Sequence, residues 1–221
     1  MGVRERQEAG PELSDAARGR REKRRLEAFS DGVFAIAVTL LVLDLKVPPL
    51  AETHDGFELG LALLREWPAY AAYLLSFGTI LIMWVNHHVL LDHVSAVDHP
   101  FLFLNGLLLM SITLVPFPTR LVADYAGHPG FQVATAVYCG LCTLVALSFD
   151  SVWWYAAGKA RLTGLGPAAG QRAISVRYIF GPLIYLTALG LSFVYPPLSL
   201  LICAGLAIFF ALPYRDPVRA G

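Results

Sequence analysis

Long apolar stretches recur along this chain and constrain its fold more than any other feature. A bilayer core about 30 Å thick is crossed by roughly 20 apolar helical residues. Because backbone polar groups in lipid must be bonded within a helix or a closed barrel, such stretches predict helices that span a membrane. They lie at 27–47, 67–91, 101–123, 131–155, 173–194 and 197–213. The sequence therefore predicts an all-α protein with six transmembrane helices.

Composition supports a membrane protein over a soluble one. Among the 221 residues, 56% are hydrophobic and only 15% are charged, whereas soluble domains carry about 25% charged residues. The formal net charge is zero, so the chain lacks the basic surplus of a nucleic-acid-binding protein. We expect a lipid bilayer and no nucleic acid among its partners.

Lysine and arginine residues are distributed unevenly between the apolar stretches. If the N-terminus is cytoplasmic, fourteen of the seventeen lie in cytoplasmic segments, as the positive-inside rule requires. Both termini are then predicted to be cytoplasmic, which agrees with six spans. We expect a disordered basic tail at 1–25, a six-span domain at 26–214 and a short cytoplasmic tail at 215–221. The N-terminal region does not resemble a cleavable signal peptide, because the first apolar run is as long as a full span.

The first span carries an aspartate near its cytoplasmic end. A carboxylate in a lipid-embedded helix is costly, so Asp31 should face protein or water and have partners. Arg25 lies less than two turns earlier, and Ser30 can also donate a hydrogen bond. These three residues form either a hydrogen-bonded polar layer or an interfacial anchor in which Arg25 extends to the headgroups.

Two stripes run along the same helix beyond Asp31. Ala28, Gly32, Ala35 and Thr39 share one face and would let another helix approach closely. Ile36, Leu40 and Leu43 form an adjoining branched apolar stripe. Their helical periodicity alone does not indicate a pore, because residues that pack against other helices or contact lipid show the same spacing.

Three motifs carry a resemblance to a known family. Arg25 followed by Phe29, Ser30, Asp31 and Gly32, and then VFAIAVTLLVL, resembles the RxxxFSDG signature and first helix of the potassium channel family named after transmembrane protein 175. SFGTILIMWVNHH at 76–88 is similar to the second span of that family, and LNGLLLMSITLVPFPTRLV at 104–122 to its third. The motifs occur in the family's order, and with the six spans they cover residues 25 to 214.

The resemblance implies a potassium-permeable cation channel in a bacterial inner membrane, and not an enzyme. Its bacterial members assemble as homotetramers in which four first helices surround a central pore. Potassium would be the permeant ion, with no cofactor and no metal site. The chain lacks the TVGYG loop with which other potassium channels replace the hydration shell of the ion, so selectivity must arise differently.

The resemblance also assigns roles to individual residues. Ile36 matches the narrowest ring of the pore, Leu40 and Leu43 continue its wall, and Thr39 matches a threonine ring linked to selectivity. Outside the pore, a structural polar network is expected to comprise Arg25, Ser30, Asp31, Trp84 and His87.

A proton-coupled transporter or proton conductor is the alternative. Histidine changes charge near neutral pH, so Asp31, His87 and His88 could serve as titratable stations. The predicted spans contain few other acids with which to build a relay. A metal site formed by His87, His88, Asp92 and His93 is disfavoured, because adjacent histidines on a helix point in different directions.

Overall fold

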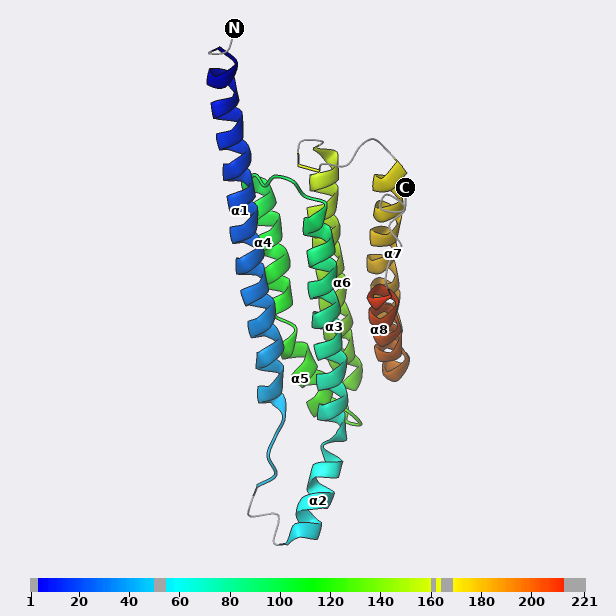
Figure 1. The fold of residues 1–221 in the computed structure, drawn as a ribbon. Coiled ribbons are helices and arrows are strands. Elements are labelled where there is room, and N and C mark those ends of the chain that lie inside the picture. Colours follow the sequence, from blue (N-terminus) through cyan, green and yellow to red (C-terminus); the bar gives the residue numbers. More distant parts are fainter. Residues whose placement is uncertain (1–3, 50–54, 160–161, 164–168, 213–221) are drawn as a thin grey trace.

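The chain folds into an elongated bundle of α-helices (Figure 1). The computed structural model describes residues 4–49, 55–159, 162–163 and 169–212. In these ranges the helices are α1 (Arg4–Leu40), the 3₁₀ helix η1 (Leu41–Asp44), α2 (Gly56–Arg65), α3 (Trp67–Asp92), α4 (His99–Thr113), α5 (Pro116–Tyr125), α6 (Phe131–Gly158), α7 (Ala169–Ser192) and α8 (Pro196–Ala211). The prediction of an all-α fold is confirmed.

Four helical segments of the described chain are long and apolar enough to cross a membrane. They are Arg18–Asp44, Trp67–Asp92, His99–Tyr125 and Phe131–Gly158, and they coincide with the first four predicted stretches. Two shorter apolar helices, Ile179–Ser192 and Pro196–Ala211, match the last two. Successive long helices run in opposite directions (Figure 1). The predicted C-terminal tail at 215–221 lies outside the described residues.

The third predicted stretch is divided into two helices. α4 ends at Thr113, and α5 begins at Pro116. Proline has no backbone N–H and its ring clashes with the preceding turn, so Pro116 is accommodated at the start of a helix and not in its interior. The chain changes direction here while remaining apolar, and α5 packs near the end of α3 (Figure 1).

Helix α2 was not predicted. Its start is capped by Asp55, whose carboxylate accepts a hydrogen bond of 2.7 Å from the backbone N–H of Glu58. It precedes α3 directly, at the end of the bundle opposite to the N-terminus of α1 (Figure 1). A ten-residue helix is too short to give the hydropathy signal of a membrane span, so the long apolar stretches of the sequence do not indicate α2.

Helix α1 begins at Arg4, inside the segment predicted to be a disordered tail. Ion pairs one turn apart favour helix there: Arg18 lies 3.3 Å from Glu22, and Lys23 lies 3.5 Å from Glu27. Once the span has nucleated the helix, adding further residues requires little additional free energy. The N-terminal part of α1 therefore projects beyond the rest of the bundle (Figure 1).

Two hydrophobic clusters hold the helices together. The first joins α1, α3, α4 and α6 and includes the fully buried Ile80, Phe101 and Trp153. The second joins α3, α5, α6, α7 and α8 and includes Tyr138 and Cys203. Helices α3 and α6 contribute to both clusters, so they form the centre of the fold.

Polar contacts tie the helices together where α3 connects to α4. Asp98 caps α4 by accepting a hydrogen bond from the backbone N–H of Phe101, and it accepts another of 2.9 Å from the hydroxyl of Tyr155 on α6. Lys159 lies 3.6 Å from the same carboxylate. Partial burial raises the pKa of the Asp98 carboxyl, but these donors outweigh it, and the pKa lies below its ordinary value of 3.8.

We predict that Asp98→Ala lowers the free energy of unfolding by about 1–2 kcal/mol, because α4 loses its cap and α6 loses a partner. Since the pKa of Asp98 is lowered in the fold, its contribution is present at neutral pH and is lost as the pH falls through that lowered pKa. Thermal unfolding in detergent micelles measures the change. Asp92→Ala, at an exposed acid near the same end, is the control, and equal midpoints for the two variants would refute the assignment.

Candidate ion pathway and the contacts that orient it

Helix α1 has a buried face directed at the bundle. Leu26, Ser30, Phe34 and Ala37 are spaced by three or four residues, Leu41 of η1 continues the series, and each is at most 7% exposed. This spacing places their side chains on one side of a helix with 3.6 residues per turn. The face packs against α3 and α4, so this is the side of α1 that the rest of the bundle covers.

The opposite face of α1 is uncovered within the single chain. This outer face continues into η1 and consists of exposed residues: Ala28, Phe29, Gly32, Ala35, Ile36, Thr39 and Leu40 of α1, and Leu43 of η1. None of them carries a charge. The apolar part of α1 is 28% buried, against 39% to 44% for the other three long spans. Of these four spans, α1 is the least buried within its own chain.

The residues predicted to line a pore lie on this outer face. Ile36 is 59% exposed, Leu40 42% and Leu43 74%. Thr39 is also exposed, and its hydroxyl donates a hydrogen bond of 2.9 Å to the backbone carbonyl of Ile36. With its proton used in this way, the oxygen of Thr39 presents its lone pairs outward, where they can accept a donor or coordinate a cation.

Asp31 lies at the border between the two faces and is held by α3. The indole Nε1 of Trp84 donates a hydrogen bond of 2.8 Å to Oδ1 of Asp31. The ring of His88 is close to that of Trp84, and its Nδ1 is 3.9 Å from the same carboxylate oxygen. The costly carboxylate therefore has a partner, and the contact links α1 to α3.

A second set of contacts, the buried polar chain, joins three helices through Ser30, Asn105 and His87. The amide nitrogen of Asn105 on α4 donates a hydrogen bond of 3.1 Å to the hydroxyl of Ser30 on α1. Its amide oxygen lies 2.8 Å from Nε2 of His87 on α3. All three side chains are at most 1% exposed, so each depends on these bonds in place of water.

The two sets of contacts bring together four of the five residues expected in a polar network: Ser30, Asp31, Trp84 and His87. Arg25 is exposed and forms no hydrogen bond or ion pair with these residues in the described part of the chain, so its role stays a prediction. Asn105 was missed, although a lone amide inside an apolar stretch is a signal that could have identified it.

Metal binding has no geometric support in the region of the histidines. Among the described residues there is no group of three or more His, Cys, Asp or Glu side chains that could hold an ion. Nδ1 of His93 lies 2.7 Å from the backbone carbonyl of Val89, whereas His87 is bonded to Asn105.

Comparisons with known proteins identify the family. The family described as "Endosomal/lysosomal potassium channel TMEM175" matches residues 25–116. A potassium channel of Chamaesiphon minutus is 50% identical over 196 residues, which cover 86% of this chain and 94% of that protein. The chain belongs to the TMEM175 family. The matched segment contains residues 25–40 of α1 and both sets of contacts that orient this helix.

Solved structures agree with this assignment to the TMEM175 family. The crystal structure of a lysosomal potassium-selective channel TMEM175 homolog from Chamaesiphon minutus superposes with a TM-score of 0.78 at 47% identity, covering 86% of this chain and 96% of that one. The Bos taurus relative, named an endosomal/lysosomal proton channel, is 31% identical over 59% of this chain, which spans 29% of that longer protein.

We predict that Asn105→Leu lowers the free energy of unfolding by about 1–3 kcal/mol, because it leaves the hydroxyl of Ser30 and the ring of His87 buried without their partner. Thermal unfolding in detergent measures the loss. Asn105→Leu combined with Ser30→Ala should cost less than the sum of the single changes, since the double variant removes one of the orphaned groups. Strict additivity would show that the bond between Ser30 and Asn105 contributes nothing.

Proposed function

We propose that this chain is the subunit of a potassium-permeable channel that conducts passively through a pore lined by α1. The observation that carries the proposal is the uncharged, exposed outer face of α1, which presents Ile36, Thr39 and Leu40 outward. The Chamaesiphon minutus relative, half identical to this chain, is named a potassium channel. Ion channels of the TMEM175 family are not enzymes.

The proposed assembly is a homotetramer with four copies of α1 around a central axis. Small side chains at Ala28, Gly32 and Ala35 permit close approach of neighbouring helices. A methyl group added at Gly32 would meet no atom outside its own helix turn within 4 Å, so there is room for a second copy. An assembly of this kind would cover the face that a single chain leaves exposed.

The proposed topology has six spans in a bacterial inner membrane, with both termini in the cytoplasm. Four long and two shorter apolar helices of the described chain run in alternating directions, which supports six crossings (Figure 1). The concentration of lysine and arginine in the segments on one side supports the orientation. Residues 26–214 then form the channel domain, flanked by cytoplasmic segments at 1–25 and 215–221.

The proposed gate is a ring of four Ile36 side chains. A narrow apolar ring is abandoned by water and blocks ions, and it refills when it widens. Leu40 and Leu43 extend the apolar wall on the same face. Four Thr39 oxygens beside the ring would offer partly dehydrated potassium a set of dipoles, because positions 36 and 39 differ by about 60° around a helix and can border one pore.

The contacts of Ser30 and Asp31 support this arrangement. A shift of one residue in the register of α1 would rotate its side chains by about 100° and turn the outer face away from an axis. Hydrogen bonds to Trp84 and Asn105 hold the helix in one rotation. No cofactor is needed for such a pore, and potassium is the permeant ion.

A proton conductor is the second candidate. Two observations favour it: His88 lies near Asp31, and the buried Nδ1 of His87 has no hydrogen-bond partner among the described residues. The Bos taurus relative is named a proton channel. Against it, the Ser30–Asn105–His87 chain is buried between helices and does not reach the outer face of α1.

We predict that liposomes containing the protein release potassium down an imposed gradient, with a steady flux and no requirement for a pH difference. Potassium-selective electrodes measure the flux, and a pH-sensitive dye in the same vesicles measures protons. Empty liposomes are the control. Absence of potassium flux from protein shown by native mass spectrometry to be tetrameric would refute the channel. Potassium movement only with a pH difference would favour proton coupling.

We predict that Ile36→Asn increases resting potassium flux, because a polar ring stays wet, and that Thr39→Ala lowers the potassium-to-sodium permeability ratio. Loss of about 1 kcal/mol of preferential coordination corresponds to a roughly fivefold change in this ratio. Reversal potentials in planar bilayers measure it. Leu74→Asn, which adds the same side chain at an exposed position of α3, is the control for Ile36→Asn and should behave as wild type. Unchanged reversal potentials in both α1 variants would place the filter elsewhere.

A further inference from the structure

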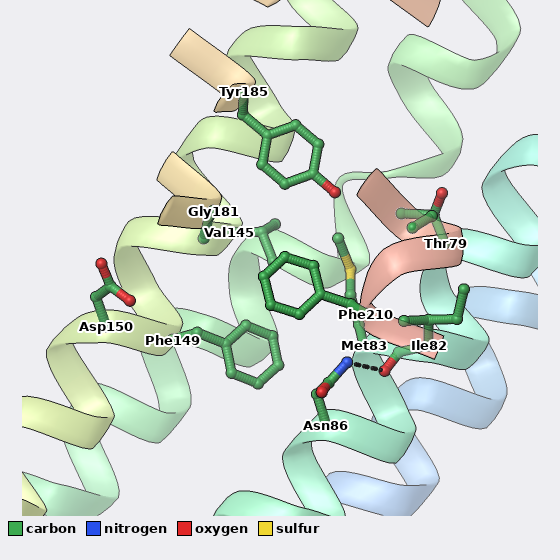
Figure 2. Close-up of a pocket in the computed structure, with 12 residues that line it drawn as sticks. Thr79, Ile82, Met83, Asn86, Val145, Phe149, Asp150, Gly181, Tyr185 and Phe210 are labelled. Atoms are coloured by element: carbon green, nitrogen blue, oxygen red, sulfur yellow. Dashed lines mark hydrogen bonds between the residues drawn. The ribbon is translucent and has the colours of Figure 1, made fainter. Parts of the chain in front are cut away.

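A pocket lies between α3, α6, α7 and α8, away from the outer face of α1 (Figure 2). The space between its lining residues amounts to about 510 Å³, and this figure includes space that is open to the surroundings. Ligand pockets in proteins combine apolar walls with a few polar groups. None of the residues assigned above to the pore or to the orienting contacts lines this pocket.

The walls of the pocket are largely aromatic. Phe149 from α6, Phe210 from α8 and Tyr185 from α7 point into it (Figure 2). The ring of Phe210 packs close to the backbone of Gly181 on α7, since a Cβ there would lie 3.4 Å from that ring. Aromatic faces carry negative charge density and attract cations as well as apolar groups.

Two polar side chains in the pocket offer acceptors. The amide nitrogen of Asn86 donates to the backbone carbonyl of Ile82 at 2.8 Å, which leaves the amide oxygen of Asn86 as an acceptor (Figure 2). Asp150 lies at the edge of the pocket, and its Oδ1 is buried without a hydrogen-bond partner in the described part of the chain. A carboxylate oxygen removed from water is stabilised only when a donor or a cation meets it.

We propose that this pocket binds a small apolar amine, with the protonated amino group at Asp150 and the apolar body between Phe149 and Phe210. An ammonium group supplies both the positive charge and the donors that Asp150 lacks, and it is compatible with aromatic walls. A carboxylic acid would be repelled by Asp150, and an alcohol would supply a donor without the charge. One carboxylate and one amide are too few ligands for a divalent cation.

The test is photoaffinity labelling of the full-length protein in lipid nanodiscs with a hexylamine that carries a diazirine on its alkyl chain. Labelled residues are located by mass spectrometry after proteolysis. We expect labels on pocket residues of α3, α6 and α8, and displacement by unlabelled hexylamine. Hexan-1-ol at the same concentration should displace the probe far less. Asp150→Asn should reduce labelling about tenfold, which corresponds to 1.4 kcal/mol of binding free energy.

Asp92→Asn is the matched control, because it removes an exposed acid from α3 and should leave labelling unchanged. Equal labelling of Asp150→Asn and wild type, or equal competition by hexan-1-ol, would overturn the proposal and leave a cavity for apolar groups only. Labels located outside the pocket would overturn it as well. If Asp150→Asn failed to fold, the competition of hexylamine and hexan-1-ol on the wild-type protein would still show whether the pocket prefers an amine to an alcohol.

Discussion

The orientation of α1 depends on a few hydrogen bonds made inside the apolar interior. Trp84 donates to Asp31, and Asn105 bridges Ser30 to His87, so that α1 is bonded to both α3 and α4. Apolar side chains alone would permit several rotations of a helix in lipid, because hydrocarbon and leucine are similar surroundings for its surface. Directional bonds between buried polar groups remove that freedom. The outer face of α1, and with it every role proposed for Ile36 and Thr39, follows from this one constraint.

The positions of the long helices could be predicted because each depends on hydropathy, which is a local property of the sequence. The break between α4 and α5 at Pro116 could not be predicted from the sequence alone, since a proline in an apolar run can either kink one helix or begin another. The helical state of residues 4–25 is not apparent from composition, because a charged segment without apolar residues at helical spacing resembles a disordered tail, whereas Arg18 and Glu22 pair one turn apart.

Prediction of the site was uneven for a physical reason. Asp31 and Trp84 belong to motifs that identify the family, so their importance could be inferred before their contact was known. Asn105 lies within a quoted motif, but its role depends on the meeting of three helices, which no local pattern reveals. The pocket near Asp150 could not be predicted for the same reason. Four helices contribute to it, and neither the length of an apolar stretch nor its periodicity reports how these helices converge.

The uncovered, uncharged face of α1 has a consequence for inheritance. A surface free of charge from Ala35 to Leu43 is tolerated by lipid, so a lone chain can complete its own fold in the bilayer. If the proposed tetramer forms in a cell that makes two versions of the chain, a version altered on this face would still fold and enter mixed tetramers, where it would act dominantly over the normal version. A version altered in the buried polar chain would be less stable, so fewer of its copies would reach the proposed tetramer and its effect would be recessive.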